Sequence, residues 1–281
     1  MNHFGVLSDP GRVRDHNEDA YLVRPPVFVI ADGMGGHAAG EVASKLAVDS
    51  IARASLDGSG GRTAVRQALV EANSVVFRAA GDSGSQRGMG TTCAVLVVGD
   101  HVVHVGNVGD SRIYRLRDDS LVQLTHDHTV VAEMVDQGLI KPDEAVLADN
   151  RSFLTRALGG AADVDAEVDT LDLLRGDRFV LCSDGLSSMV NDAEIQRIVA
   201  SVADPQAAVQ ALVDAANAAG GDDNVTAIVV DTDEIIAPAQ SRGGRNVAIG
   251  AAILVLVVLV VLVVLVVVIG AVVLMRGGSY P

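Results

Sequence analysis

Residues 91–125 read TTCAVLVVGDHVVHVGNVGDSRIYRLRDDSLVQLT. Runs of valine, leucine, isoleucine and threonine alternate here with short turns, and Gly99-Asp100 is a dipeptide typical of a β-hairpin. The strand-like runs on either side of that turn are followed by two more, SRIYRLR and LVQLT. The stretch therefore predicts a meander of antiparallel strands.

Helical patterns flank such blocks of strands in pairs. Residues 38–54 and 62–80 are amphipathic with helical spacing, and they follow a strand-like region at 4–29. Two further helices are expected between strands at 178–184 and 224–231, and a shorter helix at 130–138. Helices that come in pairs, without alternating one for one with strands, predict an α+β fold over a doubly wound parallel fold.

Four aspartates stand where strand-like runs break into small residues, namely Asp32, Asp110, Asp184 and Asp223. A strand delivers such a side chain to the edge of a sheet, and the small residues after it permit a sharp turn. Carboxylates that converge in this way repel one another unless a divalent cation neutralises them, and all-oxygen ligation favours Mg²⁺, Mn²⁺ or Ca²⁺. The alternative is that each aspartate is a turn residue.

Charge and cysteine content exclude several classes of protein. All 36 acidic residues but only 18 of the 21 basic residues lie in residues 1–240, which carry a net charge of −18 and disfavour nucleic acid as a partner. Cys93 and Cys182 lie in apolar runs and are expected to be buried and reduced. The chain has no CxxC pair, so the usual zinc frameworks are absent.

The C-terminal region has a different composition. Residues 247–275 carry no charge, and 29 helical residues exceed the roughly 30 Å hydrocarbon thickness of a bilayer. We therefore expect a domain at 1–234, a linker at 235–246, a transmembrane helix at 247–275 and a short external tail at 276–281. The polar N-terminus does not resemble an export signal, so the expected location is the cell membrane, with a single span and a cytoplasmic domain.

Eight short motifs follow one another along the chain. They are RxxNED (14–19), DGMGGHxxGE (32–41), GMGTT (88–92), GDSR (109–112), LTHDHT (124–129), RSFLTRALGG (151–160), CSDGLS (182–187) and DDNVT (222–226). In this order they resemble the metal-dependent serine/threonine protein phosphatases of the PP2C type, over roughly residues 4–231. The resemblance implies a four-layer α-β-β-α sandwich, in which two antiparallel sheets are flanked by helix pairs.

The same resemblance implies a set of site residues. Two Mn²⁺ or Mg²⁺ ions would be held by Asp32, the Gly33 carbonyl, Asp184, Asp223 and, through a water, Glu18. Arg14 would bind the phosphate, which its planar fork can clasp at two oxygens, while Asp19 and Asn224 would lie just outside the ligands. In bacterial relatives a third ion is held by residues that match Asp110, Ser152 and Asp184. Ser188 stands where many relatives have an acidic residue, and the loss of that negative charge would weaken the binding of the third ion.

His37 is the nearest candidate for a general acid, although a histidine in a glycine loop also caps helices or positions water. His101 and His104 lie three apart on a strand and are expected to be structural. His126 and His128 would share a face if extended, but a connecting loop is expected there.

The resulting prediction is a membrane-tethered protein phosphatase that acts on phosphoserine and phosphothreonine and counteracts membrane serine/threonine kinases. One alternative is an inactive phosphoprotein-binding module, although the complete set of acids favours an enzyme. Another is a phosphatase whose target is a phosphorylated regulator of transcription.

Overall fold

The computed structural model describes residues 4–35, 39–58, 60–82, 88–145, 148 and 153–232. The strands are β1 (Phe4–Asp9), β2 (Asp19–Arg24), β3 (Val27–Met34), β4 (Gly90–Thr91), β5 (Cys93–Val98), β6 (Val102–Val108), β7 (Arg112–Arg117), β8 (Ser120–Gln123), β9 (Glu167–Asp172), β10 (Arg178–Cys182) and β11 (Val225–Asp231). The helices are α1 (Ala39–Arg53), α2 (Gly61–Asp82), α3 (Val130–Asp136), α4 (Pro142–Ala145), α5 (Asp184–Ser187), α6 (Asp192–Ser201) and α7 (Pro205–Ala218).

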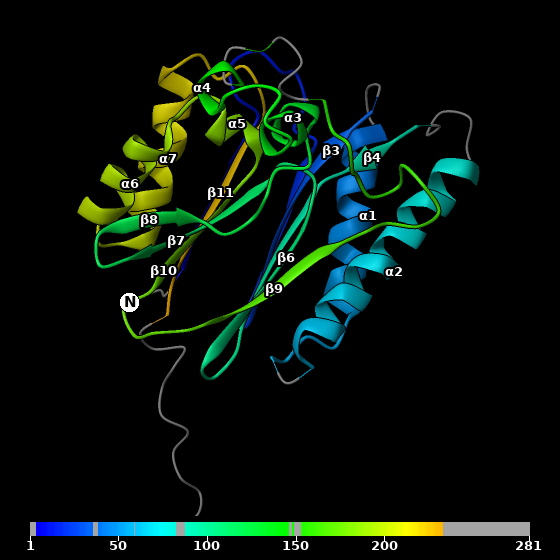
Figure 1. The fold of residues 1–281 in the computed structure, drawn as a ribbon, viewed down its shortest axis with the longest axis horizontal. Helices are drawn as coiled ribbons and strands as arrows, with labels where there is room; N and C mark the ends of the chain where they lie inside the picture. Colours follow the sequence, from blue (N-terminus) through cyan, green and yellow to red (C-terminus); the bar gives the residue numbers. More distant parts are fainter. Residues whose placement is uncertain are drawn as a thin grey trace, which may run out of the picture. The chain divides into compact units, whose positions relative to one another are not determined.

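The strands form two sheets whose neighbouring strands are all antiparallel (Figure 1). One sheet has the order β1-β11-β10-β7-β8, and the other has the order β2-β3-β5-β6-β9, with β4 pairing beside β3. The predicted meander is real, but it divides between the sheets, because β5 and β6 lie in one and β7 and β8 in the other. The first and last described strands pair with each other, with Phe4 opposite Val230.

Alternation along the strands builds three apolar layers. In β3, Val29 and Ala31 belong to the core beneath α1 and α2, whereas Phe28 and Ile30 belong to the core between the two sheets. Such alternation follows from the two-residue period of a strand. The outer face of the β1-β11-β10-β7-β8 sheet packs against α6 and α7, where Leu212 is fully buried. The order of layers is therefore helix, sheet, sheet, helix, as Figure 1 shows.

Two strand assignments differ from the sequence-based expectation. The strand-like region at 4–29 is three strands, separated by the loop at 10–18 and by a tight turn at Pro25-Pro26. Strand β9 was not expected, because its sequence EVDTLD is rich in acids and lacks a run of apolar residues. It lies at the edge of its sheet, where alternate side chains can remain in solvent.

Part of the expected organisation falls outside the described residues. This applies to the linker at 235–246, the span at 247–275 and the tail at 276–281. Of the helices that the structure does describe, none has the length and apolar character needed to cross a membrane. All described residues belong to one compact unit, which covers residues 1–236.

Candidate active site

Carboxylates from both sheets meet at one end of the sandwich. Asp19 in β2 lies directly opposite Asp32 in β3. Asp184 begins α5 just after β10, and Asp223 lies two residues before β11, the neighbour of β10. The charges of Asp19, Asp184 and Asp110 all act on Asp32, and the charge of Asp223 acts on Asp184, so the four aspartates that the sequence singled out converge.

Two glycines allow the backbone to approach closely here. A Cβ atom on Gly33 would lie 2.1 Å from the carbonyl oxygen of Gly40 at the start of α1. A Cβ atom on Gly40 would lie 2.6 Å from the Glu18 carboxylate. Neither position tolerates a side chain without a shift of the backbone or of Glu18. The glycine-rich DGMGG sequence thus lets β3, α1 and the Glu18 loop share one small space.

Asp19 is buried and held by two hydroxyl groups. Ser183 Oγ donates to Asp19 Oδ2 at 2.8 Å, and Thr226 Oγ1 donates to the same oxygen at 2.6 Å. Burial raises the pKa of Asp19 to about 7 despite these bonds. The second oxygen, Oδ1, is buried and has no hydrogen-bond partner within the described part of the chain. A buried acceptor without a donor is costly, so this oxygen indicates a missing positive partner or ordered water.

The neighbouring aspartates show the same electrostatic conflict. Burial and then the charge of Asp184 raise the pKa of Asp110 to about 8. Burial and then the charge of Asp19 raise the pKa of Asp32 well above its usual range. Among the described residues, Asp184 Oδ1 is also buried and lacks a hydrogen-bond partner. A group of all-oxygen ligands with two such orphan atoms fits divalent cations of the Mg²⁺ or Mn²⁺ kind.

The one positive side chain expected in this centre is Arg14. Its Nη2 donates to Asp223 Oδ2 at 2.6 Å, and about half of the Arg14 side chain is exposed. That bond and the charge of Asp223 raise the pKa of the guanidinium. Asn224 fixes the loop that carries Arg14 and Glu18, because its Oδ1 accepts from the Glu18 N–H at 2.8 Å and its Nδ2 donates to the His16 carbonyl at 2.8 Å.

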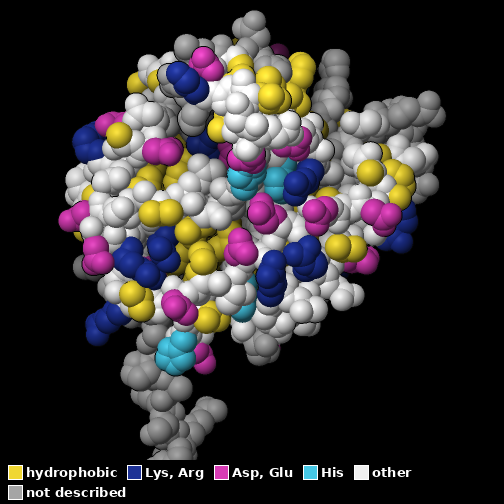
Figure 2. Space-filling view, viewed as in Figure 1, with side chains coloured by type: hydrophobic (Ala, Val, Ile, Leu, Met, Phe, Trp, Pro, Cys, Tyr) yellow, Lys and Arg dark blue, Asp and Glu magenta, His cyan; other side chains and the backbone are white. Residues whose placement is uncertain are grey.

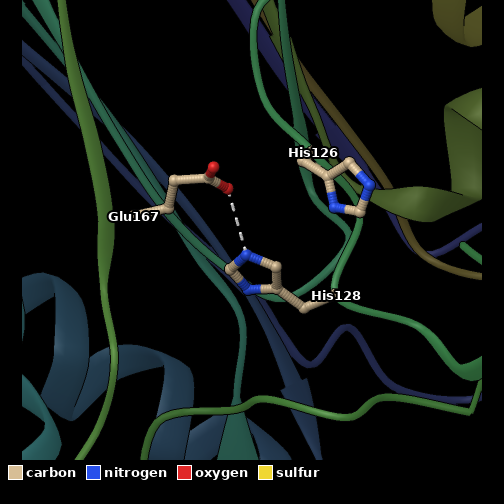
Figure 3. Close-up of side chains that lie close together, drawn as sticks. All are labelled: His126, His128 and Glu167. Carbon is tan, nitrogen blue, oxygen red and sulfur yellow. Dashed lines mark hydrogen bonds and ion pairs between the residues drawn. The ribbon is translucent and has the colours of Figure 1, made fainter. Parts of the chain in front are cut away.

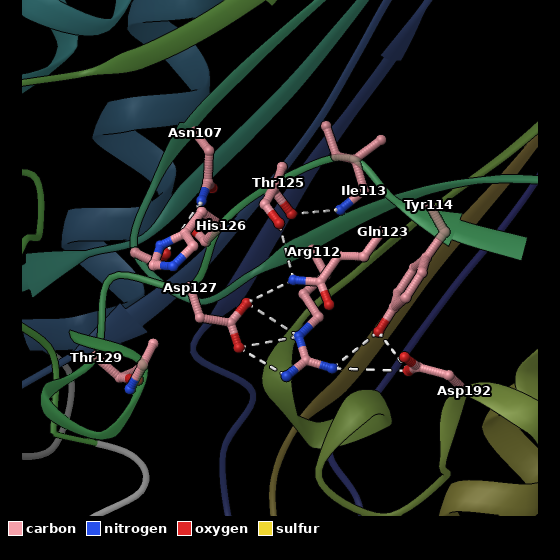
Figure 4. Close-up of polar contacts among 12 residues, drawn as sticks. Asn107, Arg112, Ile113, Tyr114, Gln123, Thr125, His126, Asp127, Thr129 and Asp192 are labelled. Atoms are coloured by element: carbon pink, nitrogen blue, oxygen red, sulfur yellow. Dashed lines mark hydrogen bonds and ion pairs between the residues drawn. The ribbon is translucent and has the colours of Figure 1, made fainter. Parts of the chain in front are cut away.

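A second arginine, Arg112, is close to the centre but fully engaged (Figure 4). Its Nε and Nη2 donate to both oxygens of Asp127, with Nη2 at 2.6 Å. Its Nη1 donates to Tyr114 at 2.9 Å and lies 3.8 Å from Asp192. Arg112 therefore connects β7 to the loop after β8 and to the start of α6. All three of its guanidinium nitrogens already contact these residues.

A pocket opens beside the carboxylates. It has a volume of about 420 Å³ and lies between Asp110 and Asp184 on one side and helix α3 on the other, with Ser188 also in its wall. On the face shown in Figure 2, acidic side chains alternate with lysine and arginine side chains. The wall of the pocket itself is acidic at Asp110 and Asp184 and apolar at Val131 and Val135 of α3.

The loop before α3 holds a histidine cluster that the sequence did not reveal. As expected, residues 126–128 form a connection and not a strand. His126 and His128 nevertheless meet Glu167 of β9, and ligand atoms of all three lie within 4.8 Å of one another (Figure 3). No local pattern could have indicated Glu167, because it lies 39 residues from His128 and comes from the unexpected strand.

Two predicted site residues cannot be placed. His37, the candidate general acid, and Ser152, a candidate ligand of a third ion, both lie outside the described residues. The nearest described residues are Gly35 and Ala39 for His37, and Phe153 for Ser152.

Comparison with known proteins identifies the class. A family model described as Protein phosphatase 2C matches residues 12–229. The serine/threonine phosphatase stp of Listeria innocua is 35% identical over 240 residues, which cover 82% of this chain and 95% of that protein. The serine/threonine protein phosphatase PstP of Mycobacterium tuberculosis is 39% identical over 232 residues, or 81% of this chain and 44% of that protein.

Solved structures agree with this assignment. The crystal structure of the Mycobacterium tuberculosis phosphatase PstP/Ppp matches with a TM-score of 0.78 and 36% identity, covering 81% of this chain and 97% of that one. The PstP catalytic domain in complex with two manganese ions matches with a TM-score of 0.75 and 36% identity, over 81% and 96% of the two chains.

The chain therefore belongs to the protein phosphatase 2C family. The predicted activity, that of a protein-serine/threonine phosphatase, is confirmed, and it is supported over the alternative of an inactive binding module. The expected α+β fold with two antiparallel sheets is confirmed as well.

Proposed function

We propose that this chain hydrolyses phosphoserine and phosphothreonine in proteins through a centre of two Mn²⁺ or Mg²⁺ ions. The observation that carries this proposal is the convergence of buried carboxylates, two of which have an oxygen with no hydrogen-bond partner among the described residues. A related catalytic domain is described in complex with two manganese ions. The ions would be held by Asp32, the Gly33 carbonyl, Asp184, Asp223 and, through a water, Glu18.

When bound, the two ions place positive charge against the phosphate and lower the pKa of a water toward neutrality. The chain's own residues bind and orient the other reactants. The Arg14 side chain is about half exposed and is paired with Asp223. When it leaves Asp223, its planar guanidinium can bind two oxygens of the substrate phosphate. Asp19, fixed by Ser183 and Thr226, presents one oxygen to the centre and can orient a water there.

The test is metal-dependent hydrolysis of a phosphothreonine peptide by the full-length chain. We expect turnover with Mn²⁺ or Mg²⁺, its loss with EDTA, and its loss in Asp32→Asn, which keeps the shape of the side chain but removes its charge. Phosphate release that continues in excess EDTA would overturn the proposal.

We further propose a third, weaker ion beside the first two, held by Asp110, Ser152 and Asp184. Asp110 and Asp184 share the wall of the 420 Å³ pocket, and the charge of Asp184 contributes to the raised pKa of Asp110. Ser188 lies in the same wall and adds no charge, which supports weak binding. Calorimetric titration with Mn²⁺ should show one weak ion after two tight ones, and a stoichiometry of two would refute it.

The proposed substrates are phosphoproteins made by membrane serine/threonine kinases, with residues 247–275 as an anchor that keeps the catalytic domain at the cytoplasmic face. The support is the uncharged run of 29 residues and the functional class. A phosphorylated regulator of transcription is the alternative substrate. Phosphoproteomics of a deletion strain separates the two, and recovery of the full-length protein in the soluble fraction after cell lysis would refute the anchor.

A further inference from the structure

His128 is a buried histidine that binds Gly109, the residue before Asp110. The Gly109 N–H donates to His128 Nδ1 at 3.1 Å, and the His128 N–H donates to the Gly109 carbonyl at 3.0 Å. Both polar groups of Gly109 are therefore held by one residue. Gly109 has a φ of +107°, and a Cβ atom there would lie 2.6 Å from Thr92, so this backbone geometry is specific to glycine.

The other side of the imidazole is fixed by the neighbouring strand. Because Nδ1 accepts a hydrogen bond, the proton of the neutral ring is on Nε2, which donates to Glu167 Oε2 at 3.2 Å (Figure 3). Glu167 lies directly opposite Asn107 in the sheet. Asn107 Nδ2 in turn donates to the Gly109 carbonyl at 3.1 Å. These contacts form a closed ring, in which each of the four residues is held by two others.

The backbone of the same residue binds the segment that follows Ser152. The His128 carbonyl accepts from the Thr155 N–H at 2.8 Å, and the next turn of the ladder joins the Val130 N–H to the Phe153 carbonyl at 2.9 Å. Thr129 and Leu154 form an isolated β-bridge between these two bonds. His128 thus joins the stretch that ends in Asp110 to the stretch that begins next to Ser152.

The histidine cluster is not arranged as a metal site of its own. A metal at His128 Nε2 would require that nitrogen to lose its proton and Nδ1 to gain one, which breaks the bond from Gly109. The Arg156 guanidinium lies 3.3 Å from the same Nε2 and would repel a cation. His126 is already paired with Asp136 at 2.8 Å.

We propose that His128 is a positioning residue for the third ion, because it holds both polar groups of Gly109, the residue before Asp110, and its carbonyl binds the Thr155 N–H. The proposal rests on the third ion put forward above. A residue that only supports the fold would need both sides of its ring equally. A positioning role predicts instead that the acceptor atom at the Nδ1 position matters more than the contact with Glu167.

The experiment compares two substitutions in the full-length chain. His128→Asn places an oxygen near the Nδ1 position and can still accept from Gly109, whereas His128→Gln places its amide near the Nε2 position and leaves the Gly109 N–H without an acceptor. The control is His104→Asn, at a buried histidine of β6 that bonds to Thr170 and lies three residues along the strand from Asn107. Mn²⁺ binding is measured by calorimetry, and the unfolding midpoint is measured alongside.

In His128→Gln, we expect the dissociation constant of the weakest Mn²⁺ ion to rise about 10- to 100-fold, as for other residues that orient metal ligands. The two tight ions should be retained. His128→Asn should lie much closer to the wild type, and His104→Asn should match it. Equal effects of Asn and Gln at position 128, or loss of all ions together with the fold, would overturn the inference. A wild-type stoichiometry of two would refute the third ion and this inference together, while leaving the two-ion phosphatase intact.

Discussion

When no metal is present, replacement of Asp19 by asparagine should stabilise the protein at alkaline pH and should leave it equally or less stable at acidic pH. Asp19 is buried, and within the described part of the chain only its Oδ2 is hydrogen-bonded, to Ser183 and Thr226. Burial is the main reason that its pKa is raised from 3.8 to about 7. Asparagine has the same shape, can retain the two hydroxyl contacts through its oxygen, and cannot ionise.

The sign follows from proton linkage. A raised pKa means that the folded state binds the proton more tightly than the unfolded state, so Asp19 contributes most stability at low pH and loses it as pH rises through about 7. At about 1.4 kcal/mol for each pH unit, the wild type loses about 3 kcal/mol between about pH 5 and pH 8, and its full ionisation penalty is about 4 kcal/mol. The asparagine NH₂ group, placed at the orphan Oδ1 position, costs about 1–3 kcal/mol at every pH.

These magnitudes predict a crossover. Asp19→Asn should be more stable than the wild type by about 1–3 kcal/mol at about pH 8 and equally or less stable at about pH 5. Urea unfolding in EDTA at both pH values measures the difference. Asp177→Asn is the matched control, because Asp177 is a buried aspartate that Arg117 binds through both oxygens. A difference between wild type and Asp19→Asn that is the same at both pH values would refute the reasoning.

Three further perturbations test the site and its support. Arg14→Lys should lower kcat/KM on a phosphothreonine peptide about tenfold, since lysine lacks the planar fork, and unchanged kinetics would exclude phosphate binding by Arg14. Asp127→Ala should destabilise the protein by up to about 3 kcal/mol in urea unfolding, because it leaves the mostly buried Arg112 without its bidentate partner. Leu181→Ala should cost about 2–5 kcal/mol in the same assay, since Leu181 is fully buried between the sheets, and a smaller loss would mean that this core collapses around the cavity.

Much of the fold was readable from local pattern. A short window of sequence is enough to recognise the apolar runs of β5, β6 and β11. The same holds for the amphipathic spacing of α1 and α2. Strand β9 did not, because an edge strand with alternating acids has no apolar run to mark it. Its place in the sheet comes from pairing with β6, which is a long-range contact.

The candidate site divides in the same way. The sequence by itself singled out Asp32, Asp184 and Asp223, because each lies in or next to the end of a strand within a recognisable motif. Only the tertiary structure showed that Arg112 is saturated by Asp127, and that His128 is closed into a ring with Gly109 and Glu167. The physical reason is that strand period and turn chemistry are set by neighbouring residues, whereas the partner of a buried polar atom is set by whichever segment the sheets bring beside it.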